Sequence, residues 1–129
     1  MPIHGFAHFN LRADRELLDV LLAFYRDVVG LTAGYRPPFR SYGYWLYAGG
    51  KDILHLTESR PDEARQTHVA TTFDHVALAC SGRAAIEAGL HANGIDFSTD
   101  HVPSTGQVQL FFRDPAGNGV ELNVAEGDA

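Results

Sequence analysis

The sequence predicts an α+β fold made of two βαβββ modules. Three observations predict it: short segments alternate apolar and polar residues as strands do, two segments carry apolar residues at helical spacing, and the order of these segments in the first half returns in the second. We expect one domain over residues 1–129, with modules at about 4–58 and 72–125. Two such modules, related by a pseudo-twofold axis, would form a cup-shaped mixed β-sheet.

The first module is predicted to begin with a strand over residues 5–11, where two sets of side chains alternate between the faces. A helix is predicted over residues 15–29, because its apolar residues recur every three or four positions. Asp14 can cap this helix, and Gly30 can end it. After a proline-containing loop at 33–40, further strands are predicted over 41–48 and 53–57.

The second module follows a polar linker over residues 58–72. A strand is predicted over 73–80, and Ser81 can cap a helix over 82–93 that ends at Gly94. The remaining strands are predicted over 95–102, 106–113 and 119–124, with Pro115 and Gly117 in the turn between the last two.

Composition narrows the possible classes of function. A chain of 129 residues that is 45% hydrophobic can bury one core. Its net charge of -6 comes from 16 acidic and 10 basic residues with no basic run, so a nucleic-acid partner is not expected. No apolar segment approaches the roughly 18 residues of a membrane span. Cys80 is the only cysteine, which fits a reducing cytoplasm, and we expect a soluble cytoplasmic protein.

Four residues of metal-ligand type occupy equivalent places in the two modules. His8 and His55 lie in the first and last predicted strands of the first module, 55−8 = 47 residues apart. His75 and Glu121 lie in the corresponding strands of the second module, 121−75 = 46 residues apart. The offsets between modules are 75−8 = 67 and 121−55 = 66. The aliphatic residues of these strands mostly take the other face, so all four side chains could converge in the cup.

This joint placement predicts a metal site. A single histidine in a strand is usually a core or partly exposed residue, and a glutamate in a terminal hairpin is usually solvated. A buried carboxylate facing three imidazoles, however, is costly without a cation, whereas a divalent metal stabilises the same group. We therefore expect His8, His55, His75 and Glu121 to bind a divalent metal.

The residues that would line a substrate site are predicted from strand faces and aromatic content. Trp45 and Tyr47 are expected in the core. The arginines at 12, 36, 40 and 113 are too scattered to predict a clamp for an anion. The candidate lining residues are Asn10, Tyr42, Tyr44, Gln109 and Phe111.

Five segments carry a resemblance to a known family: "HFNL", "FYRDVVGL", "YWLYAGGKDILHL", "DHVAL" and "FFRDPAGNGVELN". Over residues 4 to 125 the sequence resembles the vicinal oxygen chelate superfamily, which groups glyoxalase I, extradiol dioxygenases, methylmalonyl-CoA epimerase, and fosfomycin and bleomycin resistance proteins. The resemblance implies two βαβββ modules that form a cup, with a metal held by the first and last strand of each. His8, His55, His75 and Glu121 match the four ligand positions in that order. Bacterial glyoxalase I has a glutamate where this sequence has His55.

Three functions stay open at this point. In a glyoxalase-like lyase or isomerase, Glu121 would take a proton next to a carbonyl while the three histidines hold Ni, Co, Zn or Mn. In an extradiol dioxygenase, His8, His75 and Glu121 would hold Fe(II), with His55 as an acid or base beside it. A binding protein of the bleomycin resistance type would sequester a small molecule without a metal. The two-module length favours the first, with Glu121 and His55 catalytic, a small-molecule substrate, and a homodimer as the resemblance implies.

Overall fold

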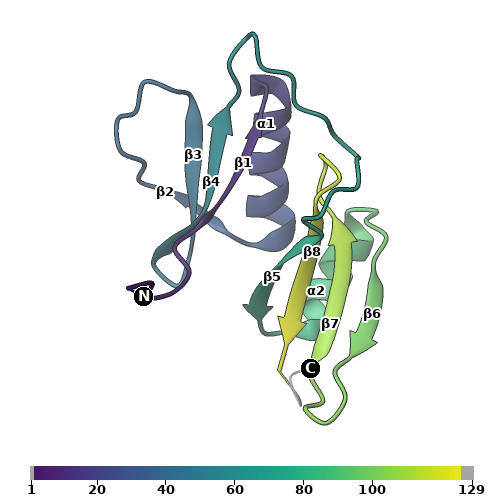
Figure 1. Cartoon of the computed structure of the whole chain (residues 1–129). Helices are drawn as coiled ribbons and strands as arrows, with labels where there is room; N and C mark the ends of the chain where they lie inside the picture. The colour runs from purple at the N-terminus through teal and green to yellow at the C-terminus, as the bar shows by residue number, and fades with distance from the viewer. Residues whose placement is uncertain (1, 126–129) are drawn as a thin grey trace. The chain divides into compact units, whose positions relative to one another are not determined.

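The computed structural model describes residues 2–125, which belong to two compact units, Met1–Gln66 and Thr67–Ala129. Each unit has the order strand, helix, three strands (Figure 1). The elements of the first unit are β1 (Phe9–Ala13), α1 (Arg15–Ala23), η1 (Phe24–Val29), β2 (Thr32–Gly34), β3 (Gly43–Ala48) and β4 (Lys51–Glu58). Those of the second unit are β5 (His75–Cys80), α2 (Arg83–Ala92), β6 (Ser98–His101), β7 (Val108–Arg113) and β8 (Gly119–Val124).

The two sheets have the same topology. Their strand orders are β1-β4-β3-β2 and β5-β8-β7-β6, and in each the first and last strands of the unit run parallel. The predicted α+β class and the predicted repeat are therefore confirmed. The union of both units in one domain, and of their sheets in one cup, stays a prediction.

Helix α1 buries its apolar face against the sheet of the first unit, where it contacts β1 and β4. Leu18 and Leu21 of α1 are almost fully buried, as are Leu54 and Leu56 of β4. Full burial of one such side chain is worth about 1.5–3 kcal/mol, so this face contributes substantially to the stability of the unit. The other face of the sheet is left free of helices and carries the polar residues of interest.

Both ends of the first helix confirm the sequence prediction. The backbone N–H of Leu17 donates to Oδ1 of Asp14 (2.9 Å), which caps the helix. Beyond Ala23 the chain widens to a π-helix, where the N–H groups of Gly30 and Leu31 both donate to the carbonyl of Tyr25. Gly30 then ends the helix with a φ of 98°, a conformation that glycine adopts without a side-chain clash.

Several elements differ from the prediction. β1 begins at Phe9, so His8 precedes the strand rather than lying within it. β2, over Thr32–Gly34, is not among the predicted strands and overlaps the start of the predicted loop over 33–40, because short edge strands carry little apolar signal. Ser81 does not cap α2: the N-cap is Gly82, with a φ of 82° and no side-chain hydrogen bond.

In the second unit, Asp114 fixes the turn that joins β7 to β8. Its Oδ1 accepts from the backbone N–H groups of Ala116 (2.8 Å) and Asn118 (2.9 Å), and its Oδ2 accepts from the Asn118 amide (2.9 Å). This buried turn sets a register in which Phe111 is paired with Glu121. The turn therefore determines that Phe111 is the β7 residue next to Glu121.

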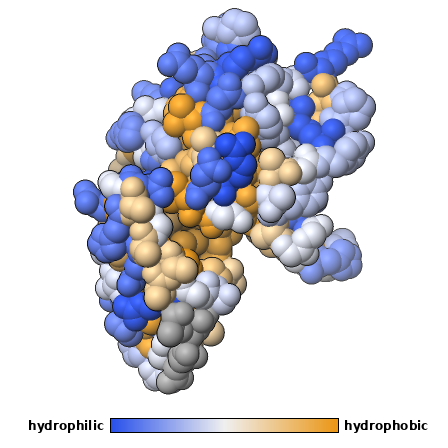
Figure 2. All heavy atoms as spheres, turned by 180° about the vertical axis from the view of Figure 1, so that it is seen from behind, coloured by the Kyte–Doolittle hydropathy of each residue, from blue (hydrophilic) through white to orange (hydrophobic). Residues whose placement is uncertain are grey.

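Hydrophobic residues also reach the surface among hydrophilic ones (Figure 2). Phe6 and Phe73 are 61% and 60% exposed, and they lie two positions before His8 and His75 respectively. Their separation, 73−6 = 67, equals that of His8 and His75, so the repeat extends to this position. No helix in residues 2–125 is long and apolar enough to cross a membrane.

Candidate functional site

His75 and Glu121 lie together on the open face of the second sheet. His75 opens β5, and the parallel register pairs Ala77 of β5 with Glu121 of β8, so both side chains project from one face. Nε2 of His75 is 3.2 Å from Oε1 of Glu121. The glutamate is 5% exposed. A carboxylate is rarely buried this far without partners.

Two neutral amides hold the other oxygen of Glu121. Nε2 of Gln109 donates to Oε2 (3.3 Å), and Nδ2 of Asn123 donates to the same atom (3.2 Å). Gln109 and Asn123 are themselves a cross-strand pair between β7 and β8. The carboxylate is thereby fixed in orientation, and Oε1 is directed at His75.

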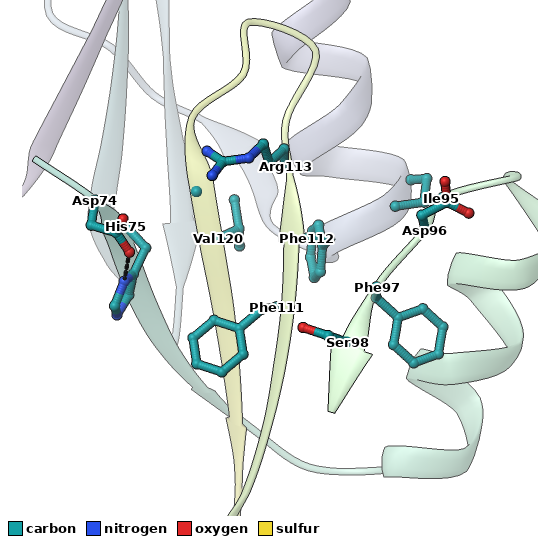
Figure 3. Close-up of a pocket in the computed structure, with 11 residues that line it drawn as sticks. Asp74, His75, Ile95, Asp96, Phe97, Ser98, Phe111, Phe112, Arg113 and Val120 are labelled. Atoms are coloured by element: carbon teal, nitrogen blue, oxygen red, sulfur yellow. Dashed lines mark hydrogen bonds and ion pairs between the residues drawn. The ribbon is translucent and has the colours of Figure 1, made fainter. Parts of the chain in front are cut away.

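The partners of His75 determine what its ring can offer. Nδ1 of His75 lies 2.8 Å from Oδ2 of Asp74, as the dashed line in Figure 3 shows. An ionised carboxylate only accepts hydrogen bonds, so Nδ1 carries the proton of a neutral ring. Nε2 then presents a lone pair to Oε1 of Glu121. Two acceptors at this distance are stabilised only by a second proton on the ring or by a cation between them.

The donor pair has the geometry that a divalent metal requires. Metal–nitrogen and metal–oxygen bonds of about 2.0–2.2 Å place neighbouring ligand atoms roughly 3.0–3.4 Å apart. The separation of Nε2 and Oε1 is 3.2 Å. Across residues 2–125, no three His, Cys, Asp or Glu side chains form a group that could hold a metal ion. The pair therefore needs further ligands to complete a coordination shell.

A hollow of about 600 Å³ opens beside His75 within the second unit (Figure 3). Phe97, Ser98 and Phe111 line it, together with the backbone of β8 at Gly119. Phe111 also meets the His75 ring edge to face, with centroids 5.7 Å apart. The hollow is large enough for a small organic molecule and has aromatic walls next to the His75–Glu121 pair.

In the first unit, His55 is enclosed between two rings. His8 stacks on one face, with centroids 3.7 Å apart and planes 16° apart, and Trp45 stacks on the other at 4.0 Å and 7°. Trp45 and His55 are direct partners across β3 and β4, so Trp45 lies on the polar face of the sheet. The prediction of Trp45 as a core residue is wrong, because the residue that faces the helix from β3 is the fully buried Leu46.

The stack limits how the first unit can bind a metal. The lone pair of an imidazole nitrogen lies in the ring plane. In nearly parallel rings at 3.7 Å, the lone pairs of His8 and His55 lie in two nearly parallel planes and so do not converge on one point. In this arrangement one of the two histidines can ligate a given metal, and ligation by both requires a turn of the His8 ring.

Asp52 is a site residue that the sequence reasoning missed. Its Oδ2 lies 2.7 Å from Nε2 of His55. The hydrogen bond from His55 lowers the pKa of the Asp52 carboxyl. Regular alternation places residues 52 and 55 on opposite faces, but the β3–β4 register skips Ile53, which forms a β-bulge and turns Asp52 to the face of His55. No feature of the sequence marks this bulge.

The other predicted lining residues separate into two groups. Asn10 is paired with His55 across β1 and β4, and its amide donates to Oγ1 of Thr57 (2.9 Å) on the open face. Tyr42 and Tyr44 instead donate to Oδ1 of Asp19 on α1, at 2.7 and 3.0 Å. The hydrogen bond with Tyr44, and then that with Asp19, raise the pKa of Tyr42. Both tyrosines thus belong to the helix side, and we leave them out of the proposed site.

Arg12 lies in a cluster with two linker arginines that the sequence reasoning did not consider. Its Nε lies 2.7 Å from Oε2 of Glu63, and Nε of Arg65 lies 2.5 Å from the same oxygen. Arg60 approaches the other oxygen at 3.7 Å, and these residues border a hollow of about 760 Å³. The hydrogen bonds from Arg12 and Arg65 lower the pKa of Glu63 to about 2. The two further arginines come from the linker, whose path the sequence pattern does not predict.

Comparison with known proteins gives one family. A sequence model of the Glyoxalase/Bleomycin resistance protein/Dioxygenase superfamily matches residues 5–122. Among solved structures, lactoylglutathione lyase from Agrobacterium tumefaciens is similar at 25% identity and a TM-score of 0.66, with 96% of each chain covered. A glyoxylase/bleomycin resistance protein/dioxygenase domain from Frankia sp. EAN1pec has 18% identity and a TM-score of 0.74, covering 96% of this chain and 99% of that one. No curated protein matches the chain.

Proposed function

Because the chain belongs to the Glyoxalase/Bleomycin resistance protein/Dioxygenase superfamily, we propose that it is a metal-dependent, glyoxalase-like lyase or isomerase. Its substrate would be a small molecule with two adjacent oxygens. In this proposal His75 and Glu121 are metal ligands of the second unit, and His8 and His55 are the ligands that the first unit supplies. Glu121 is also the base that moves the substrate proton.

The observation that carries the proposal is the opposed pair of acceptors in the second unit. Nε2 of His75 and Oε1 of Glu121 face each other at 3.2 Å. The remaining atom of each group is already engaged, Nδ1 by Asp74 and Oε2 by two amides. A histidine that donates its second N–H to a carboxylate is the usual arrangement at a metal site. The pair thus has both the spacing and the supporting contacts of metal ligands.

In this proposal Glu121 also moves the proton of the substrate. When bound, the divalent metal would supply Lewis acidity to the two oxygens of the substrate. Oε2 is held by Gln109 and Asn123, so Oε1 would serve in turn as the metal ligand and, when it is not bound to the metal, as the atom that accepts a proton from a carbon next to a carbonyl. The donors on Oε2 are neutral amides, which orient the carboxylate without neutralising it as an arginine would. Burial of Glu121 keeps water away from the proton in transfer.

The hollow beside His75 supports a partly apolar substrate. Phe97 and Phe111 form its walls, and Ser98 is paired with Phe111 across β6 and β7. Gln109 follows the same face of β7 toward Glu121. We propose that the reacting oxygens of the substrate lie toward His75 and Glu121 while its carbon skeleton packs on the ring of Phe111.

A dioxygenase acting on a catechol-like substrate is the second candidate, and the ring stack of the first unit favours it. Because the nearly parallel rings of His8 and His55 do not direct their lone pairs at one point, a ligand set that takes only one histidine from the first unit agrees with the stack. In that set His8, His75 and Glu121 would hold Fe(II). His55, hydrogen-bonded to Asp52, would then be an acid or base beside the metal.

Elemental analysis of the untagged protein tests the metal proposal. We expect stoichiometric metal in the wild type and in the control His101→Ala, and loss of metal in His75→Ala and Glu121→Ala. His101 is an exposed residue of β6, so its removal should leave the sheet intact. Metal retained by His8→Ala, His55→Ala, His75→Ala and Glu121→Ala alike would exclude the site.

Turnover then separates the functions. Hemithioacetal turnover with Ni, Co, Zn or Mn supports the lyase. Iron with oxygen uptake on catechols supports the dioxygenase. Tight binding of an aromatic drug by a metal-free protein would instead assign the chain to the drug-binding members of the superfamily.

A further inference from the structure

We propose that Asp52 is a positioning residue that keeps the proton of the His55 imidazole on Nε2, so that Nδ1 is the nitrogen His55 offers to the site. The consequence for metal binding rests on the proposed function. The tautomer itself is a property of the metal-free chain and can be measured there.

The hydrogen bond between Asp52 and His55 determines which nitrogen of the imidazole carries the proton. Oδ2 of Asp52 lies 2.7 Å from Nε2 of His55. A carboxylate accepts hydrogen bonds and has no proton to give when ionised, so Nε2 must be the donor. A charge-assisted bond of this length is stronger than one between neutral groups. In a neutral ring the lone pair then lies on Nδ1.

The ring stack keeps the His55 ring from rotating away from Asp52. Trp45 and His8 cover the two faces of the ring, and His55 is 8% exposed. A half-turn of the ring would need space between these neighbours. It would also place a C–H group where Nε2 meets Asp52 and so lose the hydrogen bond. Packing and hydrogen bonding therefore favour the same orientation.

Nδ1 of His55 is open to a ligand. Within residues 2–125, the one buried side-chain nitrogen or oxygen that lacks a hydrogen-bond partner is Nε of Arg36. Nδ1 of His55 has no hydrogen-bond partner among these residues, so it must be reached by solvent. A hollow of about 510 Å³ bordered by His8 and Asp52 lies next to the stack.

In the second unit the carboxylate contacts the other nitrogen of its histidine. There Asp74 takes Nδ1 of His75 and leaves Nε2 directed at Glu121. The two carboxylates reach their histidines by different routes. Asp74 is the residue before His75, whereas Asp52 comes to His55 only through the bulge at Ile53. The bulge is thus the backbone feature that selects Nδ1 of His55.

Imidazole nitrogen NMR on ¹⁵N-labelled, metal-free protein tests the proposal. At about pH 9 an ordinary imidazole is neutral, and we expect His55 to show a protonated Nε2 and a bare Nδ1. In Asp52→Ala, exchange of the Nε2 proton with water should speed up at least about tenfold, because a hydrogen bond to a charged group is lost. Asp62→Ala is the matched control. The side chain of Asp62 is 87% exposed, and its Oδ1 lies 3.9 Å from Nε of Arg60.

Two results would overturn the proposal: a proton on Nδ1 of wild-type His55, or an unchanged exchange rate in Asp52→Ala. If Asp52→Ala does not fold, Asp52→Asn provides the test. Its amide oxygen can still accept from Nε2 but carries no negative charge, so exchange of the Nε2 proton should also speed up in this variant. An exchange rate equal to that of the wild type in folded Asp52→Asn also counts against the role of Asp52.

A zinc titration separates this inference from the proposed function. If both hold, Asp52→Ala should weaken Zn²⁺ binding about 10- to 100-fold while Asp62→Ala does not. If the wild type binds no metal, the proposed function fails, and the NMR result still decides the role of Asp52. If metal binds tightly but the tautomer is reversed, the inference fails alone.

Discussion

Trp45 and His55 face each other across β3 and β4 with ring planes 7° apart and centroids 4.0 Å apart. The cross-strand register places them directly opposite, and the indole covers the ring face that His8 leaves free. An aromatic residue at this position therefore supports the His55 ring rather than the helix-facing core.

Replacing Trp45 should cost stability through this stack. Aromatic pairs contribute about 0.5–1.5 kcal/mol beyond their buried area, so Trp45→Ala should lower the free energy of unfolding by at least that amount, and Trp45→Phe by less. Urea unfolding measures both. Phe39→Ala is the control, because Phe39 is 54% exposed and meets Trp45 only at 6.1 Å with tilted rings. Equal losses for Phe39→Ala and Trp45→Ala would contradict the assignment.

Glu121→Gln should separate catalysis from folding. The amide has nearly the same shape, but it is a poor base and a poor metal ligand. We expect kcat/KM of the proposed lyase reaction to fall about 10²- to 10⁴-fold. Glu87→Gln is the control, since Glu87 pairs with Arg83 on the surface of α2, and it should keep full activity. A Glu121→Gln variant with wild-type kcat/KM would remove Glu121 from the mechanism.

The amide contact on Glu121 predicts a measurable coupling. Asn123→Ala removes a donor from Oε2 at 3.2 Å, and the loss of one such bond to a buried carboxylate should cost about 1–2 kcal/mol of unfolding free energy. In the background of Glu121→Gln, Asn123→Ala should lower the unfolding free energy by less, because the negative charge that accepts from the Asn123 amide is gone. A double-mutant cycle from urea unfolding gives the coupling energy. Strict additivity would mean that Asn123 does not support the carboxylate.

Glu63 predicts a pH dependence of stability. Its pKa is lowered to about 2 from an ordinary 4.5, first by the hydrogen bond from Arg12 and then by that from Arg65. Because the folded-state pKa is the lower one, this stabilisation is fully present above about pH 5 and is lost as the pH falls toward 2. The melting temperatures of wild type and Glu63→Gln should therefore differ at pH 6 and converge at pH 2. The difference should shrink in high salt, since the arginines are partly exposed.

The features that depend on local sequence patterns could be predicted from the sequence. Alternation and helical spacing predicted the two modules, and equal spacing in both placed His75 beside Glu121 and His8 beside His55 in their own units. Sequence reasoning failed for Asp52, whose face depends on one unpaired residue in β4. A bulge reverses alternation without any change in residue type, so no pattern of apolar residues can reveal it.

Long-range register explains the other differences. Trp45 and Tyr44 are neighbours in sequence, and either could have faced the core. The structure puts Tyr44 against Asp19 of α1 and Trp45 against His55. The meeting of Arg12 with Arg65 depends on the path of the linker, which carries few apolar residues to constrain it. Such contacts between distant segments are set by tertiary packing rather than by local propensity.

Gly119 should be as important for the proposed metal site as the proposed ligands themselves. It is the β8 partner of His75, and a Cβ at this position would overlap the backbone carbonyl of Asp74 and come within 2.9 Å of the His75 Cβ. Gly119→Ala must therefore push β5 away from β8 and move His75 from Glu121. We expect lower stability and loss of bound metal together.

Gly89→Ala is the matched control for that substitution. Gly89 lies within α2, and a Cβ there meets no atom within 4 Å. Alanine in a helix interior is favoured over glycine by about 0.5–1 kcal/mol, so this variant should be more stable than the wild type and keep its metal. Thermal unfolding and elemental analysis of both variants make the comparison. If Gly119→Ala retained wild-type stability and metal content, the close approach of β5 and β8 at His75 would not be needed for the site.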